Sequence, residues 1–505
     1  MNKRICWLLA IPFVSVFLDL LPASGQEAQV KLSDATEACL SCHSLYSQGI
    51  VKDWQQSRHA RTTVRQAVEK PDKERRVSLQ ALEDARIASA DVAVGCAECH
   101  LLDPKLHEDT FPHNGHEVHV VVSPPDCAHC HPAERTQYLN QNKMSRAHGN
   151  LAGNPVYRSL GDTVLGVKRV AGRGLTISPP SEATQMEACY GCHGTEVKVR
   201  GLKKLNTPMD PIDVPDLAGW PNTGVGRVNP DGSLGSCSAC HARHSFSIAL
   251  AREPQTCGQC HVEPDVPAWN VYRNSRHGNL YASRKGAWDL DAVPWRLGKD
   301  FGAPTCATCH ASLVVDAEGA VLFQRTHGFG ERLWVRLFGP IYSHPQPIDP
   351  DTAKIRNQAG LPLPVTYEGE AASSFLIPPE EQTRRRMSMM TLCQGCHSTQ
   401  WAALHFEKLA GTLRDVDEMV RQATLLMQEA WAEGLASRDN PFDEVLEMLW
   451  VEAWLFHANP VRFTSAMAGS ADYAAFHGGW WGLSKSILGL HQAIAVKRSM
   501  PAERP

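Results

Sequence analysis

The sequence predicts a mainly α-helical protein with extensive ordered coil, little sheet and a helical bundle at its C-terminal end. Three observations support this expectation. A five-residue motif, C-x-x-C-H, occurs eight times at irregular intervals, so no unit of fixed length repeats as it would in a solenoid. Glycine and proline are frequent in 136–235 and 311–380, which predicts coil. After residue 398 the apolar residues follow helical spacing instead.

The motifs use 16 of the 17 cysteines, and the remaining one, Cys6, lies in an apolar N-terminal run. C-x-x-C-H is the attachment signature of c-type haem, in which two thiols bond vinyl groups and the histidine binds the proximal side of the iron. Disulfides or zinc sites are the alternatives, and eight copies without a stray cysteine in the mature chain disfavour both. We therefore expect eight covalently bound c-type haems. The attaching cysteines are Cys39, Cys42, Cys96, Cys99, Cys127, Cys130, Cys189, Cys192, Cys237, Cys240, Cys257, Cys260, Cys306, Cys309, Cys393 and Cys396, and the proximal histidines are His43, His100, His131, His193, His241, His261, His310 and His397.

Eight haems change what the chain length implies. By length alone, the 480 residues that follow the first 25 suggest several domains. Each haem is a large apolar disc that replaces side chains as core, so the size limit on a single core applies weakly. We expect one octahaem-binding body over 26–397, with haems as its core, and a C-terminal helical region over 398–505.

Residues 1–25 are expected to be a cleaved secretory signal peptide. Lys3 and Arg4 precede an apolar run over 5–18, and small residues suit cleavage near residue 26. Asp19 ends the run short of the ~20 residues that a membrane span needs. A periplasmic or otherwise exported location also fits c-type haem, which is attached outside the cytoplasm.

The net charge of −4 and the pI of about 6.6 indicate neither a nucleic-acid partner nor a membrane surface.

Within the body, the charged stretch 54–86 is expected to form surface helices. Residues 136–235 are expected to be long coil broken only by the fourth motif. Residues 311–380 are expected to be similar, with short strand-like runs at 313–315 and 321–323.

The C-terminal region is expected to form two or three long helices without a haem motif. Apolar residues at helical spacing continue to Ala430, and Pro441 interrupts them before a second run over 442–457. These helices are expected to buttress the haem body or to make subunit contacts.

Fifteen of the 23 histidines remain once the eight proximal ones are set aside. A pure electron carrier needs eight more, one on the far side of each iron, whereas a catalytic cytochrome leaves one iron open. Six histidines stand in short polar motifs, and one member of the group His107, His113, His116 and His119 is expected to supply a seventh ligand. Seven distal ligands for eight haems leave one iron open, without indicating which. The six are His59, His148, His244, His277, His327 and His457.

Over roughly residues 34–490 the order and spacing of the motifs resemble the octahaem hydroxylamine oxidoreductase family. The resemblance lies in the eight motifs, in Ala-Arg-His244-Ser-Phe-Ser after the fifth, and in the sixth beginning 20 residues after the fifth. Ser-Arg-His277-Gly, Thr326-His327 and the long helical C-terminus extend it. Absence of C-x-x-C-K separates the chain from the pentahaem nitrite reductases that have a lysine-ligated haem.

The resemblance implies that the fourth haem is catalytic, with Cys189 and Cys192 attaching it, His193 proximal and the opposite face open. It implies bis-histidine ligation of the other seven, with His116 as the ligand from its group, and a homotrimer. In that family an Asp-His pair after the sixth motif and a tyrosine after the seventh line the catalytic pocket. Asp265 matches the aspartate and Tyr342 the tyrosine.

Two departures from the family pattern bear on the direction of the reaction. Val266 replaces the histidine of the Asp-His pair, which removes a base of near-neutral pKa. The oxidising members cross-link the catalytic haem to a C-terminal tyrosine of a neighbouring subunit. The candidate here, Tyr473, stands in a different register before the Gly-Trp sequence. Both departures favour the reductive branch of the family.

The sequence therefore predicts an exported octahaem oxidoreductase that interconverts hydroxylamine, nitrite and similar nitrogen compounds at the open iron, with a lean toward reduction. Asp265, Tyr342 and Tyr473 are the candidate catalytic residues. The expected redox partner is a cytochrome or a quinone-linked electron carrier. The alternative is a non-catalytic multihaem conduit for electrons, which would have a histidine on every iron.

Overall fold

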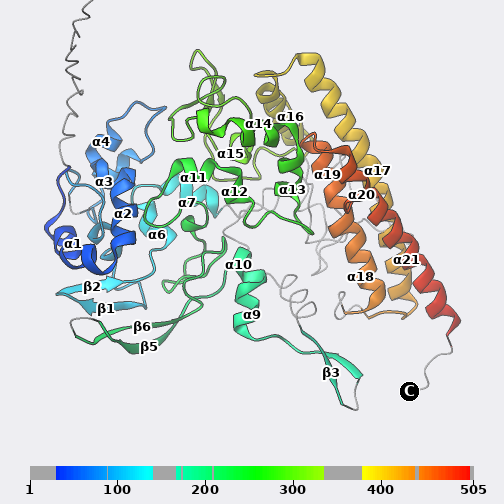
Figure 1. Cartoon of the computed structure of the whole chain (residues 1–505), viewed down its shortest axis with the longest axis horizontal. Coiled ribbons are helices and arrows are strands. Elements are labelled where there is room, and N and C mark those ends of the chain that lie inside the picture. Colours follow the sequence, from blue (N-terminus) through cyan, green and yellow to red (C-terminus); the bar gives the residue numbers. More distant parts are fainter. Residues whose placement is uncertain are drawn as a thin grey trace, which may run out of the picture.

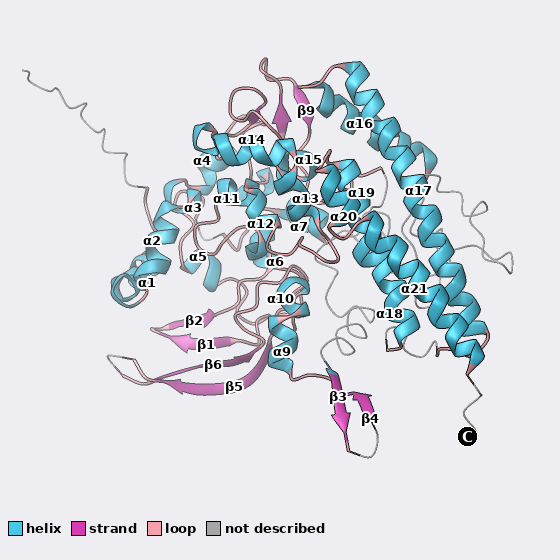
Figure 2. Ribbon diagram, turned by 45° about the vertical axis from the view of Figure 1, so that its right-hand side comes forward, coloured by secondary structure: helices cyan, strands magenta, loops and turns pink. Residues whose placement is uncertain are grey.

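The computed structural model is mainly helical with short hairpins, as predicted, and it ends in a layer of long helices (Figure 1). It describes residues 30–87, 89–139, 166–171, 174–207, 210–334, 378–437 and 443–500. The N-terminal part and the C-terminal helices lie at opposite sides of the molecule, and the middle of the chain lies between them (Figures 1 and 2). Within the described residues no helix combines the length and the apolar character that crossing a membrane requires.

The N-terminal part consists of short helices joined by turns, in keeping with the surface helices predicted over 54–86. They are α1 (Asp34–Tyr46), α2 (Gln48–Gln56), α3 (Arg58–Arg61), α4 (Val64–Val68), η1 (Leu79–Leu82), α5 (Ala97–His100), α6 (Pro124–Ala128) and α7 (Pro132–Tyr138). Polar caps define where they begin: Ser33 accepts a hydrogen bond from the Thr36 backbone N–H, and Thr63 forms a capping box with Gln66.

The hairpin of β1 (Thr110–His113) and β2 (His116–His119) is closed by Asn114 and Gly115. Both turn residues have positive φ angles, 50° and 78°, as a two-residue type I′ turn requires. This turn makes His113 and His116 cross-strand partners, so their side chains lie on the same face of the hairpin.

The prediction that 136–235 is coil broken only by the fourth motif is wrong. This stretch contains α9 (Glu182–Glu187) and two hairpins, β3 (Val167–Val170) with β4 (Gly174–Ile177) and β5 (Lys198–Leu205) with β6 (Ile212–Ala218). Proline frequency predicts coil, but both strands of a two-stranded sheet are edge strands, where a missing N–H is tolerated. Pro215 lies within β6, opposite Leu202.

The middle of the chain contributes short helices and a small sheet. The helices are α10 (Cys189–His193), η3 (Cys237–Ala239), α11 (Ile248–Arg252), α12 (Pro254–Cys257), α13 (Ala268–Asn274), α14 (Arg276–Arg284), η4 (Lys285–Ala287) and α15 (Cys306–His310). In the sheet β7 (Trp295–Arg296) pairs with β8 (Val314–Val315), which pairs with β9 (Val321–Phe323). The strand-like runs predicted at 313–315 and 321–323 are thus confirmed.

The C-terminal layer is a helical bundle, as predicted. It contains α16 (Pro379–Gln394), α17 (Thr399–Ala432), α18 (Val445–Val451), the π-helical turn η7 (Glu452–His457), α19 (Ala458–Ala466), α20 (Ala471–Phe476) and α21 (Trp480–Ser499). The apolar stripe of α17 is buried from Ala402 to Ala430, and from Val416 onward it packs against α18, η7, α19 and α21. Two tryptophans have hydrogen-bonded indole N–H groups: Trp450 donates to Thr424 and Trp431 to Glu447.

One buried ion pair joins α17 to α19. Arg462 is fully buried and donates two hydrogen bonds to Asp417, at 2.9 and 3.2 Å. Burial raises the pKa of Asp417 to about 6, although the positive charge of Arg462 opposes that shift. The Asp417 carboxyl therefore binds its proton more tightly in the folded protein than in the unfolded chain.

This pair predicts a pH-dependent contribution to stability. A carboxyl whose pKa is raised by folding loses stability as the pH rises from about 4 to about 6. We expect the melting temperature of the wild type minus that of Asp417→Asn to fall over this interval, by the equivalent of about 3 kcal/mol at most. Thermal unfolding followed by circular dichroism at pH 4, 5, 6 and 7 measures this difference. A difference that is constant with pH would contradict the assignment.

Candidate haem cavity and catalytic site

Each C-x-x-C-H motif folds into a single helical turn. In the second motif the His100 backbone N–H donates to the Cys96 carbonyl at 2.9 Å, and the third, fifth, sixth and eighth motifs form the same bond. Residues i, i+3 and i+4 of a helical turn lie on one face. Both thiols and the histidine of a motif therefore face the same side, as attachment to one haem requires.

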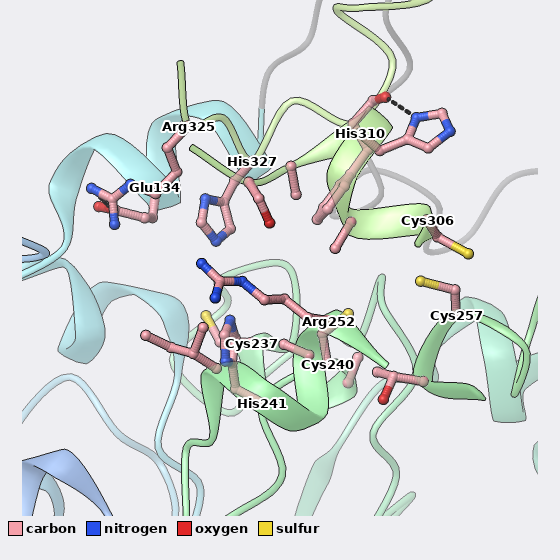
Figure 3. A pocket seen from close by; sticks show the side chains of 18 of the residues that line it. Glu134, Cys237, Cys240, His241, Arg252, Cys257, Cys306, His310, Arg325 and His327 are labelled. Carbon is pink, nitrogen blue, oxygen red and sulfur yellow. Dashed lines mark hydrogen bonds and ion pairs between the residues drawn. The ribbon is translucent and has the colours of Figure 1, made fainter. Parts of the chain in front are cut away.

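The motifs line a connected cavity of about 1930 Å³, part of which is shown in Figure 3. Pockets for one small molecule measure roughly 300–1,000 Å³, so this cavity suits several large groups. Twelve motif cysteines and six proximal histidines lie on its wall. None of the sixteen motif cysteines forms a disulfide, in keeping with haem attachment. Cys42 and Cys396, in the first and last motifs, are exposed.

Arginines on the cavity wall, one of them buried and two partly buried, provide a second test of whether haem fits. Arg76 lies within electrostatic range of both Arg252 and Arg325, and burial lowers the pKa of Arg76 and Arg252 to about 10. Glu134 pairs with Arg325 at 2.6 Å, while one guanidinium nitrogen of Arg76 is buried without a hydrogen-bond partner. Buried cations need anionic partners. Haem propionates would supply them, so the donor set fits the group. An isolated arginine belongs to no recognisable sequence motif, so these residues could not be identified from the sequence.

Histidine rings face five of the proximal histidines at a constant distance. A metal–nitrogen bond of about 2 Å, as in zinc–histidine sites, separates the centroids of two rings on one metal ion by roughly 6 Å. The observed centroid distances fit an iron between the rings. They are 6.2 Å for His43–His113, 6.4 Å for His59–His131, 6.5 Å for His100–His244, 6.4 Å for His241–His327 and 6.2 Å for His277–His397.

Four of the predicted distal ligands, His59, His244, His277 and His327, are thus brought opposite a proximal histidine. In the group 107–119 the structure corrects the choice, because the ring opposite His43 is that of His113 and not of His116. The two residues face each other across the hairpin turn, and sequence spacing does not tell them apart.

The motifs adjoin one another in a continuous series. Neighbouring cysteine side chains join the first motif to the second, the third to the fifth, the fourth to the sixth and the sixth to the seventh; the pairs are Cys39–Cys96, Cys127–Cys237, Cys192–Cys260 and Cys257–Cys306. Three further pairs of cysteines lie close enough to interact electrostatically. They join the second motif to the third, the fifth to the sixth and the seventh to the eighth; the pairs are Cys99–Cys130, Cys240–Cys257 and Cys309–Cys393. The fourth motif therefore branches from a chain of the other seven.

Asp265 lies beside this branch. The loop after the sixth motif places Asp265 and Val266 on the cavity wall. Asp265 is close enough to interact electrostatically with Cys192 of the fourth motif. Burial raises the pKa of the Asp265 carboxyl, while hydrogen bonds from the backbone N–H groups of Asp265 and Val266 oppose that shift. The structure thus brings together the fourth motif and the aspartate that sequence reasoning selected.

Tyr473 does not line the cavity. Its side chain is buried within its own chain, where the hydroxyl donates a hydrogen bond to the Glu263 carboxylate and the ring stacks on His477 at 5.1 Å. Glu263 precedes Asp265 by two residues, so Tyr473 contacts the loop that carries the candidate catalytic aspartate.

A solved structure described as a hypothetical multiheme protein has the same fold over nearly the whole chain. It superposes with a TM-score of 0.81 and is 37% identical, covering 93% of this chain and 96% of that one. A family model described as "Seven times multi-haem cytochrome CxxCH" matches residues 231–322, which contain the fifth, sixth and seventh motifs. This chain belongs to the multihaem c-type cytochromes.

More distant relatives of the cytochrome are named for nitrogen chemistry. A Kuenenia stuttgartiensis protein described as a probable nitrite reductase-hydroxylamine oxidoreductase fusion protein is 23% identical over 418 residues, or 82% of this chain. The cytochrome spans 40% of the length of that relative. A solved complex described as the reducing HAO-like protein complex of the same organism shares the fold, with a TM-score of 0.54 and 17% identity over 92% of this chain and 85% of that one.

Several predicted residues lie elsewhere. The signal peptide over 1–25, His148 and Tyr342 lie outside the described residues. His457 lies apart from the main cavity, on the wall of a small pocket of about 230 Å³ that Glu263 and His477 also line. Its Nδ1 hydrogen-bonds the Gly478 carbonyl at 3.1 Å. Its role as a distal ligand stays a prediction.

Two other histidines of the group 107–119, His107 and His119, are buried beside Asp109 and Asp126. The Asp109 and Asp126 carboxylates outweigh burial and raise the pKa of His107 to about 10; the His107 Nε2 hydrogen-bonds Asp126 at 3.2 Å, and its Nδ1 lies 3.7 Å from Asp109. His119 stacks on it at 3.7 Å with 10° between the ring planes. Because the two rings are stacked and nearly parallel, their nitrogen lone pairs do not point to a common position. A single metal ion therefore cannot lie along the lone pairs of both rings. His119 instead accepts a hydrogen bond from His100 Nδ1 on its backbone carbonyl, at 2.8 Å.

Proposed function

We propose that this cytochrome is an exported octahaem oxidoreductase that interconverts hydroxylamine, nitrite and related nitrogen compounds, working in the direction of reduction. The site is the open face of the haem attached by Cys189 and Cys192, with His193 proximal. The observation that carries the proposal is the position of Asp265, a partly buried carboxyl on the cavity wall beside the fourth motif. The names of the distant relatives agree with this class of substrate.

When bound, the site haem supplies an iron that holds the substrate nitrogen and exchanges electrons with it. The protein supplies the protons. Because burial raises the pKa of Asp265, this carboxyl holds its proton at a pH where an exposed aspartate is ionised. An aspartic acid beside the substrate can therefore donate a proton as electrons arrive and recover it from solvent afterwards.

Two observations support reduction over oxidation. The residue after Asp265 is Val266, so this position offers no imidazole to accept protons from a nitrogen compound that is being oxidised. The hydroxyl of Tyr473 is hydrogen-bonded to Glu263 of its own chain and does not line the cavity. The position of Tyr473 favours an unmodified haem.

The order of the motifs supports rapid delivery of electrons. The fourth motif adjoins the sixth, and the sixth lies within the continuous series that runs from the first motif to the eighth. The exposed cysteines of the first and eighth motifs mark the ends where a redox partner, a cytochrome or a quinone-linked carrier, would exchange electrons. Several electrons stored close to the site allow a multi-electron reduction without release of intermediates.

The same proposal includes eight haems, a homotrimer and export by a signal peptide that is cleaved. Five haems have the histidine pairs described above, with His113 in place of His116. His148 and His457 are the proposed ligands for two more.

Spectroscopy and mass spectrometry of the purified cytochrome test this proposal. We expect an intact mass with eight haems and without residues 1–25, a high-spin haem signal in electron paramagnetic resonance, and no haem-linked peptide containing Tyr473. Nitrite or hydroxylamine should be consumed with reduced methyl viologen as the electron donor. A spectrum with low-spin haems only would contradict the catalytic proposal and favour the electron conduit. A cross-linked Tyr473 peptide would reverse the proposed direction.

A further inference from the structure

We infer that two residues of the C-terminal helices, Asn459 and Tyr473, are positioning residues that hold the Asp265 loop at the catalytic haem. The inference deepens the proposed function and rests on it, because it assigns a role relative to Asp265. It also gives the helical region a part in the chemistry beyond packing against the haem body.

Asn459 contacts the backbone of Asp265 directly. Its side-chain amide donates a hydrogen bond to the Asp265 carbonyl oxygen at 2.8 Å. Asn459 lies on α19 and is 1% exposed, so water does not compete for this bond. A bond to the carbonyl fixes the peptide plane from which the Asp265 side chain projects, and its donor comes from a residue 194 positions away in the sequence.

The amide of Asn459 is itself oriented by the buried ion pair. Arg462, one helical turn further along α19, donates to the Asn459 side-chain oxygen at 3.3 Å and to Asp417 of α17 at 2.9 Å. Because the arginine occupies the oxygen of the amide, the nitrogen is directed to Asp265. The series Asp417–Arg462–Asn459 therefore connects the core of the bundle to the loop.

Tyr473 holds the same loop at a second point. Its hydroxyl donates to the Glu263 carboxylate, and the backbone N–H of Glu263 donates to Asn270 Oδ1 at 3.1 Å. Glu263 and Asp265 are thus both anchored, one through its side chain to α20 and the other through its carbonyl to α19. Two anchors two residues apart leave the intervening loop little freedom.

Such anchoring is expected to matter because proton donation depends on distance. A displacement of about 1 Å in a catalytic group lowers the rate by up to roughly 100-fold. Asn459→Asp is the sharpest variant, because a carboxylate still accepts from Arg462 but cannot donate to the Asp265 carbonyl. Tyr473→Phe removes only the hydroxyl. Ser465→Ala, at a buried position on the same helix, is the matched control.

The experiment measures kcat/KM for nitrite reduction in a double-mutant cycle. Asn459→Asp is expected to lower kcat/KM about 10-fold in the wild-type background and less than 2-fold in the Asp265→Asn background. Cyanide titration of the high-spin haem gives a readout without turnover, and Asn459→Asp is expected to change the cyanide affinity whereas Ser465→Ala leaves it unchanged. Haem content and melting temperature are measured on every variant. If Asn459→Asp does not fold, Tyr473→Phe, with an expected loss of about 3-fold, takes its place in the cycle.

The outcomes separate the inference from the proposed function. A loss of activity in Asp265→Asn without any effect of Asn459→Asp or Tyr473→Phe would overturn the inference and leave the proposed function intact. Equal losses in both backgrounds would also overturn it, because the residues would then act independently of Asp265. Full activity of Asp265→Asn would overturn the proposed role of Asp265 and the inference together.

Discussion

Replacement of Asp265 by asparagine is expected to lower kcat/KM for nitrite or hydroxylamine reduction by about 100-fold, the usual contribution of a positioned proton donor. The side chain keeps its shape and loses its ionisable proton. The pH dependence gives a second signature. Because burial raises the pKa of Asp265, the wild-type rate should fall as the pH rises through that pKa and the carboxyl ionises. The variant should lack this part of the profile.

Steady-state kinetics with reduced methyl viologen at several pH values measure both effects. Asp291→Asn is the matched control, since Asp291 is an exposed carboxylate paired with Arg58 at 2.8 Å, and this change should leave kcat/KM and its pH profile intact. An Asp265→Asn enzyme with the wild-type rate and pH profile would exclude Asp265 as the proton donor.

Removal of His113 is expected to convert one of the eight proposed haems from low-spin to high-spin. The ring of His113 lies 6.2 Å from that of His43, with room for an iron between them, so His113→Ala would leave the sixth position of the first haem to water. Electron paramagnetic resonance should show one additional high-spin haem per chain, and that haem should bind cyanide.

His116→Ala provides the control on the same hairpin. His116 is the cross-strand partner of His113, so both side chains lie on the same face of the hairpin, and it is the His113 ring that lies against the His43 ring. Its removal should leave the spin states unchanged. A gain of high-spin haem in His116→Ala with none in His113→Ala would restore the ligand that sequence spacing first suggested.

Much of the architecture could be predicted because its causes are local. A C-x-x-C-H motif carries its own attachment chemistry, and the buried stripe of α17 follows from the 3.6-residue period of a helix. The β5–β6 hairpin could not be predicted in this way. Proline counts against a strand in a prediction from sequence, whereas an edge strand tolerates proline, as at Pro215. The π-helical turn at Glu452–His457 likewise has no signal in the periodicity.

In the candidate site, too, features with local causes could be predicted and features with tertiary causes could not. Sequence by itself determined the haem-binding motifs, four histidines that lie opposite proximal partners, and Asp265 as the residue after the sixth motif that matches a family aspartate. Tertiary structure alone decided that His113 faces His43, that arginines without a motif provide cations in the cavity, and that Asn459 hydrogen-bonds Asp265 across 194 residues. The physical reason is that attachment needs only residues within one helical turn, whereas ligation of the far face of an iron and the orientation of a loop depend on segments that folding alone brings together.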